Sequence, residues 1–284
     1  MSTPRPTTPR LWTGLTLAGA AIGLAGAASA QSVVIEPMVP MQGQLWLADA
    51  QGGAVVPALG GEGGEGGEAG SVASGDPTVD FLASLLQIEG HLATGFALWK
   101  SGEADNGQAH MGHPGAEVYE SIEGTLGDLG LPQFEDKLDM LVKAAASGAP
   151  DADLDALHGE ILTSIATARG TAVAGDPKDD FTAIVHLIRK AGDEWGEGVT
   201  DGALAELHEY QDAWGFVEAA KARATVLSAS ETPEIKAAAT AALAALDELA
   251  PALPGVLPTG TIGGDPSYFA VAAAKIELAA SQVK

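Results

Sequence analysis

The amino-acid sequence predicts an all-α protein of two tandem halves, each similar to a four-helix bundle, that follow a disordered N-terminal region. From residue 76 onward apolar residues recur with helical spacing and alanine is abundant, whereas strand-like alternation of apolar and polar residues is absent. The helix-start sequence Gly-Asp-Pro occurs three times, at residues 75–77, 175–177 and 264–266. A tract rich in Gly and Glu, residues 60–75, precedes the helical region.

The first 30 residues have the features of a secretory signal peptide. Arg5 and Arg10 precede or flank an apolar run at residues 11–27, and Ala28 and Ala30 occupy the small-residue positions of a cleavage site. The alternative is a transmembrane anchor, but the run is short and its end is typical of peptidase cleavage. We therefore expect a periplasmic or secreted protein with no membrane-spanning segment after cleavage of the signal peptide.

Two segments separate the signal peptide from the helical region. Residues 31–59 are short apolar pieces broken by Pro and Gly. Residues 60–75 have little apolar surface to bury, and their glycines lose much conformational entropy on ordering, so they predict a flexible linker. The helical domain is expected at residues 76–284.

Composition limits the classes of function. With no cysteine, the chain has neither disulfide bonds nor thiolate metal ligands. The formal net charge is −24, which disfavours binding to nucleic acid or to anionic lipid. An acidic surface suits a metal ion or an envelope protein as partner, although an acid-rich proteome gives the same composition.

The three Gly-Asp-Pro sequences predict where helices begin. The aspartate can accept hydrogen bonds from free backbone N–H groups, and proline suits the first helical position. The expected helices of the first half (76–174) span residues 77–101, 114–129, 132–147 and 151–170, with a short turn or helix at 103–111. Those of the second half (175–284) span residues 177–199, 201–229, 233–250 and 266–283.

The first two copies of this sequence lie 100 residues apart, and their apolar residues stay in step. Phe81 and Phe181 correspond, as do Leu85 with Val185 and Ile88 with Ile188. This i, i+4, i+7 spacing is that of a packed helix face. The pattern indicates either an internal duplication or three capping sequences that arose independently.

Histidine and glutamate are concentrated at residues 110–117, in the sequence HMGHPGAE. His113 precedes Pro114, so we expect His113 to cap a helix that begins there, with Glu117 one turn inside it. If the preceding connector folds back onto the first helix, His91 and His110 join them. The predicted metal ligands are thus His91, His110, His113 and Glu117, with Glu89 or Glu120 as an extra ligand or a supporting residue.

Imidazole and carboxylate ligands together suit iron, copper or zinc, and Met111 is a possible soft ligand for copper. The alternative is that His113 is an ordinary cap, that His91 is a histidine at the edge of the core, and that the glutamates only favour a helix N-terminus. His208 and Asp212, one turn apart, form a second pair that either binds a cation or pairs internally.

Other chemistry has little support in the sequence. His158 is expected at the edge of the core, and His186 at the surface near Arg189 and Lys190. There is no Gly-x-Ser-x-Gly nucleophile motif, and the glycines of residues 60–75 lack the lysine and the flanking strand of a phosphate-binding loop.

The segment GHLATGFALW, Gly90 to Trp99, resembles the Gly-x-His-x-x-Glu helix of imelysin-type periplasmic proteins, which leads into a Leu-Trp pair. With the signal peptide and the tandem bundles, this resemblance implies a metal-linked periplasmic role associated with iron uptake, with His91 as the matching residue. The chain has Thr94 where the family has Glu, and its spacing to Trp99 is one residue longer. Residues 96–119 also resemble uncharacterised secreted bacterial helical proteins, which implies no activity.

The sequence therefore predicts a secreted or periplasmic helical protein that binds Fe, Cu or Zn through a His/Glu cluster. We expect a binding or uptake component rather than an enzyme. The alternative is a non-enzymatic interaction or structural module of the cell envelope that binds no metal. A metal-dependent enzyme is the third interpretation.

Overall fold

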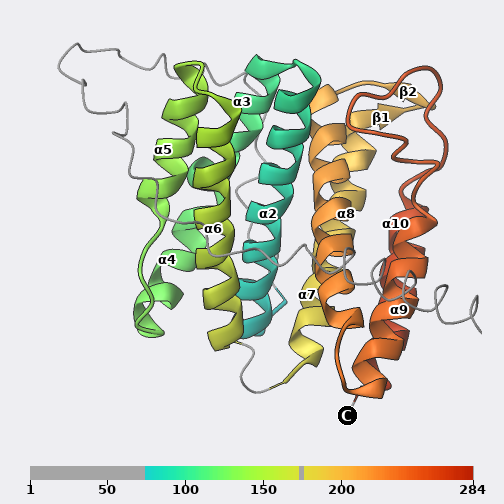
Figure 1. Cartoon of the computed structure of the whole chain (residues 1–284). Helices are drawn as coiled ribbons and strands as arrows, with labels where there is room; N and C mark the ends of the chain where they lie inside the picture. Colours follow the sequence, from blue (N-terminus) through green and yellow to red (C-terminus); the bar gives the residue numbers. More distant parts are fainter. Residues whose placement is uncertain (1–73, 173–175, 284) are drawn as a thin grey trace, which may run out of the picture. The chain divides into compact units, whose positions relative to one another are not determined.

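The computed structural model describes residues 74–172 and 176–283, and within these ranges the chain is helical almost throughout (Figure 1). The all-α prediction is confirmed. The elements are α2 (Pro77–Ser101), α3 (Ala104–His113), a π-helical turn η1 (Pro114–Val118), α4 (Tyr119–Asp128), α5 (Glu135–Ala146), α6 (Asp151–Ala172), α7 (Lys178–Gly198), β1 (Val199–Thr200), β2 (Ala203–Leu204), α8 (Leu207–Ser228), α9 (Pro233–Asp247) and α10 (Ser267–Ala280). The expected signal peptide, residues 31–59 and residues 60–73 of the expected linker lie outside the described ranges.

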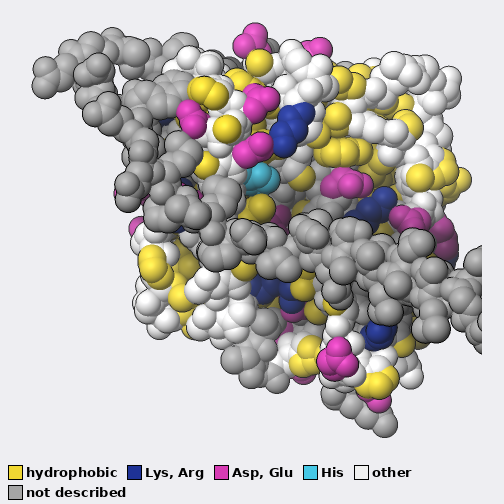
Figure 2. All heavy atoms as spheres, viewed as in Figure 1, with side chains coloured by type: hydrophobic (Ala, Val, Ile, Leu, Met, Phe, Trp, Pro, Cys, Tyr) yellow, Lys and Arg dark blue, Asp and Glu magenta, His cyan; other side chains and the backbone are white. Residues whose placement is uncertain are grey.

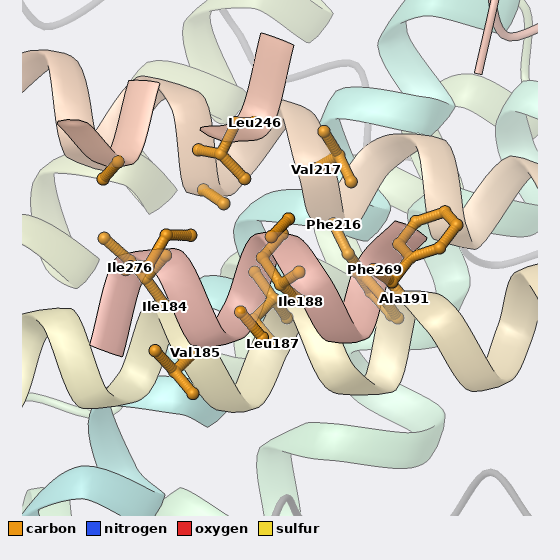
Figure 3. Packing of buried hydrophobic residues seen from close by; sticks show 14 of the residues in the cluster. Ile184, Val185, Leu187, Ile188, Ala191, Phe216, Val217, Leu246, Phe269 and Ile276 are labelled. Atoms are coloured by element: carbon orange, nitrogen blue, oxygen red, sulfur yellow. The ribbon is translucent and has the colours of Figure 1, made fainter. Parts of the chain in front are cut away.

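Helix α2 packs against two separate apolar clusters. The first joins Leu82, Ala83 and Leu86 of α2 to residues of α7, α8, α9 and α10, whose side chains Figure 3 shows from close by. The second joins Phe81 and Leu85 of α2 to residues of α4, α5 and α6. In Figure 1, α2 accordingly runs between α6 and α8. Because α2 is apolar on more than one side, it is a core helix common to both clusters.

Helix α2 is also long and apolar enough to cross a membrane, by length and composition alone. From the sequence we expect no membrane-spanning segment after the signal peptide. In the structure 83% of the most apolar window of α2 is buried by the rest of the protein. The position of α2 between two apolar clusters is thus sufficient to explain its composition.

The three aspartates of the Gly-Asp-Pro sequences accept backbone hydrogen bonds at helix starts, but only Asp76 is itself the N-cap residue, because α7 and α10 begin one residue after the proline. The Asp76 carboxylate accepts a hydrogen bond from the Thr78 backbone N–H at 2.8 Å, and Asp176 accepts one from the Lys178 N–H at 2.9 Å. Asp265 does the same for the Ser267 N–H at 2.8 Å. Each carboxylate therefore satisfies an N–H group that the helix itself leaves without a partner.

The apolar residues that stay in step over 100 positions have corresponding places in the two halves. Phe81, Leu85 and Ile88 are buried in one apolar cluster. Phe181, Val185 and Ile188 are buried in the other. This correspondence agrees with a duplication, which stays a prediction.

The expected helix at residues 201–229 begins later than predicted. Residues 199–204 form a small hairpin in which Val199 pairs with Leu204 and Thr200 with Ala203. Asp201 and Gly202 make its two-residue turn and both have positive φ, 52° and 74°. Asp-Gly is a strong signal for such a turn, and here it displaces the first residues of α8.

The prediction that His113 caps a new helix at Pro114 is wrong. His113 is the last residue of α3 and has helical φ and ψ, and the chain continues through η1 into α4 without a break. Proline has no N–H for the carbonyl one turn back, and its ring crowds that carbonyl. The chain accommodates Pro114 by widening into a π-turn, closed by the bond from the Tyr119 N–H to the Pro114 carbonyl.

On the face shown in Figure 2, acidic side chains are scattered among apolar and uncharged ones. Several surface carboxylates pair with the few basic residues, as Glu277 does with Arg189 at 2.9 Å. Such exposed pairs contribute little to stability. The excess of acidic residues is therefore mostly a property of the surface.

Candidate metal centre

Helix α3 folds back onto α2 through two glycines. A Cβ on Gly107 would lie 2.7 Å from the carbonyl oxygen of Gly95, and a Cβ on Gly95 would lie 2.8 Å from Met111 Cγ. Both distances are shorter than real Cβ contacts, so only glycine permits this approach. The short turn or helix expected at residues 103–111 is thus a helix packed along α2, which carries His110 and His113 to His91.

Helix α8 approaches another part of α2 in the same way. A Cβ on Gly90 would lie 2.6 Å from Phe216 Cδ1, and a Cβ on Gly215 would collide with the Gly90 carbonyl. The Thr94 hydroxyl then donates a hydrogen bond to the Gln211 carbonyl at 2.9 Å. This contact places Asp212 of α8 against the histidines of α2 and α3.

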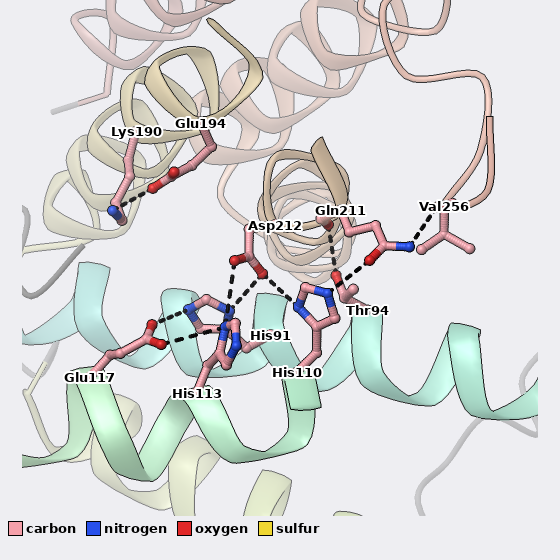
Figure 4. A network of polar contacts seen from close by, with 10 residues as sticks. All are labelled: His91, Thr94, His110, His113, Glu117, Lys190, Glu194, Gln211, Asp212 and Val256. Atoms are coloured by element: carbon pink, nitrogen blue, oxygen red, sulfur yellow. Dashed lines mark hydrogen bonds and ion pairs between the residues drawn. The ribbon is translucent and has the colours of Figure 1, made fainter. Parts of the chain in front are cut away.

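Asp212 is the centre of the cluster (Figure 4). Its Oδ1 lies 2.8 Å from His91 Nδ1 and 2.9 Å from His110 Nδ1, and its Oδ2 lies 3.5 Å from His113 Nδ1. One donor atom from each of these four residues can be chosen so that all lie within 4.8 Å of one another. This spacing is close to that of ligands around one metal ion, which needs bonds of about 2.0–2.2 Å.

Glu117 lies beside the same group from the η1 turn. Its Oε1 is 3.6 Å from His113 Nδ1, and its Oε2 is 3.8 Å from His91 Nε2. His113 and Glu117 share a helix face at i, i+4 spacing. Of the four predicted ligands, the structure thus brings the three histidines and Glu117 together, and adds Asp212.

His110 is held at both ring nitrogens. Its Nε2 lies 3.0 Å from Gln211 Oε1, opposite the contact with Asp212. The Gln211 amide nitrogen in turn donates to the Val256 carbonyl at 3.3 Å. His110 is fully buried, so these contacts fix the direction of its ring.

The burial of the cluster determines its protonation. Burial lowers the pKa of His91, although the charge of Asp212 opposes that effect. Burial alone would raise the pKa of Asp212, but His91 and His110 hold it well below its usual range. The favoured state is therefore an ionised Asp212 that accepts hydrogen bonds from imidazole N–H groups.

A second charged pair lies next to Asp212 on α7. Lys190 Nζ is 2.5 Å from Glu194 Oε1, and Figure 4 shows the pair beside the Asp212 carboxylate. Burial raises the pKa of Glu194, Lys190 opposes that shift, and the charge of Asp212 adds to it. The surroundings of the cluster therefore include one lysine together with the carboxylate that pairs with it.

The structure places the other predicted residues away from the cluster or at its edge. Glu89 forms a two-bond ion pair with Arg169 of α6 at 3.1 and 2.7 Å, so it does not support the histidines. Glu120 is exposed. Met111 is fully buried in the apolar cluster of the first half. His208 is exposed, with its ring 4.9 Å from that of His110.

The two remaining histidines have structural surroundings. His158 stacks on Phe96 at a ring distance of 4.1 Å, and burial lowers its pKa to about 4. His186 is partly exposed, and its pKa is lowered by partial burial and by the charge of Arg189. Both agree with the positions expected from the sequence.

Asp212 is the residue that sequence reasoning left out of the ligand set. The sequence pairs it only with His208, one helical turn away. The signal that could have found it is Gly215, a glycine inside a helix, three residues later. Gly90 next to His91 is the same combination on α2, and in both places the glycine marks a close helix contact beside a buried polar residue.

Residues 170–283 match the family model described as the iron permease-associated 4-helix bundle domain. The matched region contains α7 to α10 and therefore Asp212, whereas His91, His110 and His113 precede it. No curated protein and no solved structure matches the chain. The match supports a helical protein associated with iron uptake, without pointing to imelysin-type proteins in particular.

Proposed function

We propose that this protein binds a transition metal ion, iron in the first place, as a binding or uptake component of an iron-transport system. The observation that carries the proposal is the meeting of three histidines and a buried aspartate from three helices, with donor atoms within 4.8 Å. Neutral imidazole and carboxylate oxygen are suitable ligands for iron, copper and zinc. Iron is favoured among them because of the iron permease-associated match.

The packing of the helices supports a binding role for the cluster. Burying an ionised carboxylate is costly unless it is paired and hydrogen-bonded. Asp212 is 2% exposed, and its ion-pair partners among the described residues are three histidines rather than lysine or arginine. A protein needing only stability would gain from an apolar residue at this position. The retention of the charge is what a cation site requires.

The N-terminus and the family match suggest where the protein acts and which class of partner it has. The signal-peptide features of residues 1–30 favour the periplasm or the exterior of the cell. A membrane permease is the partner class suggested by the description of the matched family. In this proposal the protein binds the ion outside the cytoplasm and passes it to such a partner.

Metal analysis of the purified protein tests the proposal. The chain is purified without a polyhistidine tag from cells grown with iron, and its metal content is measured by mass spectrometry. We expect one ion per chain in the unmodified protein and none in the variant His110→Ala/His113→Ala. His186→Ala, which removes a histidine outside the cluster, should keep the metal.

A loss of metal through unfolding has to be separated from a loss of ligands. Circular dichroism of each variant establishes whether the helices persist. Because His113 is partly exposed, His113→Gln should remain folded and serves as a milder second variant. Equal metal content in the unmodified protein and in both cluster variants would contradict the proposal.

A second candidate function is an envelope interaction module that binds no metal. The exposed apolar side chains of α10 favour it: Tyr268 is 42% exposed, Val271 50% and Leu278 70%. Exposed apolar residues on one helix indicate a contact surface when they form a patch. The metal analysis separates the two candidates, since this module would contain no ion in any variant.

A further inference from the structure

We infer that the two carboxylates of the cluster have different roles. Glu117 binds the ion together with His91 Nε2 and His113 Nδ1, whereas Asp212 stays outside the ligand set and orients His91 and His110. The inference rests on the proposed function, because it assigns the ligands and the class of ion at the same site. Figure 4 shows the residues concerned.

Two of the three contacts between Asp212 and histidine nitrogens have hydrogen-bond lengths, whereas His113 Nδ1 lies farther away, 3.5 Å from Oδ2. His91 Nδ1 and His110 Nδ1 lie 2.8 and 2.9 Å from Asp212 Oδ1. An ionised carboxylate only accepts hydrogen bonds, so both Nδ1 atoms carry the hydrogen. A ring nitrogen that donates a hydrogen has no lone pair for a metal. The nitrogen of a neutral His91 that can bind an ion is therefore Nε2.

His91 Nε2 is directed at Glu117. It is buried, has no hydrogen-bond partner among the described residues, and lies 3.8 Å from Glu117 Oε2. The corresponding distance from His113 Nδ1 to Glu117 Oε1 is 3.6 Å. Both exceed the roughly 3.2 Å limit of an ordinary N–H···O bond. They fit two donors that share one ion, because bonds of about 2.0–2.2 Å place donors roughly 3–4 Å apart.

The accessible side of the cluster is also the side of Glu117. The side chains of His113 and Glu117 are 17% and 16% exposed, whereas those of His91 and Asp212 are 2% exposed and that of His110 is fully buried. An arriving ion meets Glu117 and His113 before any other member. To reach Asp212 it would have to break two buried hydrogen bonds of a charged group, which is costly.

The contacts of Asp212 are those of a group that orients a ligand histidine without binding the ion itself. Ligand histidines usually donate their other ring N–H to a carboxylate or carbonyl, which fixes the tautomer and makes the ligand more basic. Asp212 does this for His91. His110, held between Asp212 and Gln211 Oε1, keeps the carboxylate in place.

This ligand set indicates the class of ion. Two neutral imidazoles and one carboxylate, with coordination positions left open, are typical of ferrous iron bound without haem. The open positions also suit an ion that must be taken up and released, since incoming ligands can attach before the protein ligands leave. The site is therefore expected to take a divalent ion such as Fe²⁺ as its cargo.

Binding measurements on matched variants test this division of roles. The untagged full chain is titrated without oxygen with Fe²⁺, and with Co²⁺ as a coloured probe of ligand geometry. We expect Glu117→Gln to weaken binding about 100-fold or more, and Asp212→Asn to weaken it about 10- to 100-fold while the stoichiometry and Co²⁺ spectrum persist. Glu120→Gln, an exposed carboxylate one turn from Glu117, should leave affinity unchanged.

Glu117 is partly exposed, so Glu117→Gln should fold, and that variant decides the question. Unchanged affinity in Glu117→Gln, or a loss of binding in Asp212→Asn with a changed Co²⁺ spectrum, would place the ion at Asp212 and overturn the inference. If the unmodified chain binds neither Fe²⁺ nor Co²⁺, the proposed function itself fails. Nitrogen-15 NMR of the metal-free protein gives a separate check, because His91 should carry its hydrogen on Nδ1 and lose that preference in Asp212→Asn.

Discussion

Gly90 of α2 and Gly215 of α8 lie in direct contact, because a Cβ on Gly215 would overlap the Gly90 carbonyl. The two helices therefore approach so closely here that a Cβ on either glycine would collide with atoms of the other helix. His91 follows one glycine by one residue, and Asp212 precedes the other by one helical turn. The 2.8 Å bond between these two residues depends on that contact.

Substitution of Gly215 by alanine should separate α2 from α8. Overpacking of this kind costs about 1–3 kcal/mol, and the bond between His91 and Asp212 should lengthen or break. We expect a lower midpoint in urea unfolding and weaker metal binding. Gly124 is the matched control: it lies in α4, and a Cβ there would have nothing within 4 Å. Gly124→Ala should therefore be neutral or stabilising by up to about 1 kcal/mol.

The ion-pair network around Arg169 should be important for stability and unimportant for metal binding. Arg169 is 6% exposed and pairs with Glu89, while its Nε lies 3.8 Å from Asp180 Oδ1. Arg223 of α8 also donates to Asp180. Arg169→Met leaves two carboxylates partly uncompensated, which should cost about 3–5 kcal/mol. Urea unfolding measures this loss.

The control for this prediction is Arg189→Met. Arg189 pairs with Glu277 at the surface, where the two side chains are 51% and 65% exposed. Its loss should change the free energy of unfolding by less than about 1 kcal/mol. The milder variant Glu89→Gln should lower stability without changing metal affinity. A clear loss of affinity in that variant would return Glu89 to the binding site.

His158 should make the protein less stable in acid. Burial lowers its pKa from 6.5 to about 4 in the folded protein, so the unfolded chain binds the proton more readily. This contribution to stability is complete above the unfolded pKa and is lost as the pH falls from about 6.5 to 4, by about 3 kcal/mol at most. In His158→Gln the free energy of unfolding should depend less on pH in that range. Parallel curves for the two proteins would contradict the assignment.

Gln211 should affect binding through His110 without touching the ion. Its amide connects His110 Nε2 to the Val256 carbonyl. Gln211→Met removes this connection and should weaken metal binding about 10-fold or more, with a stability loss of about 1–3 kcal/mol. Gln211→Glu keeps an acceptor for His110 and should restore most of the affinity. The NMR signals of the His110 ring nitrogens should shift in the first variant and less in the second.

The local features of the fold could be predicted from the sequence. Helix α2 spans the predicted residues, because a capping aspartate, a first-turn proline and a continuous apolar pattern agree there. The prediction failed at Pro114, where a proline that usually begins a helix lies inside one. Whether the chain forms a π-turn at a proline depends on how the helix packs against its neighbours. A short stretch of sequence does not reveal that packing.

The candidate site could be predicted only in part. His110, His113 and Glu117 are close in the sequence, and that proximity predicted part of the cluster. Asp212 is 121 residues from His91, so its position depends on how α8 packs. The sequence does not show that Gly90 contacts Gly215 rather than another glycine, because this contact depends on how the helices assemble.

Because α2 belongs to both apolar clusters, the second half of the chain should not fold properly without it. A fragment of residues 170–283 would lack the helix that covers Phe181 and its neighbours on α7 and α8. We expect this fragment to bind hydrophobic dyes and to associate, whereas residues 74–283 unfold in a single transition. Although the family match begins at residue 170, we expect the cooperative folding unit to extend back to α2.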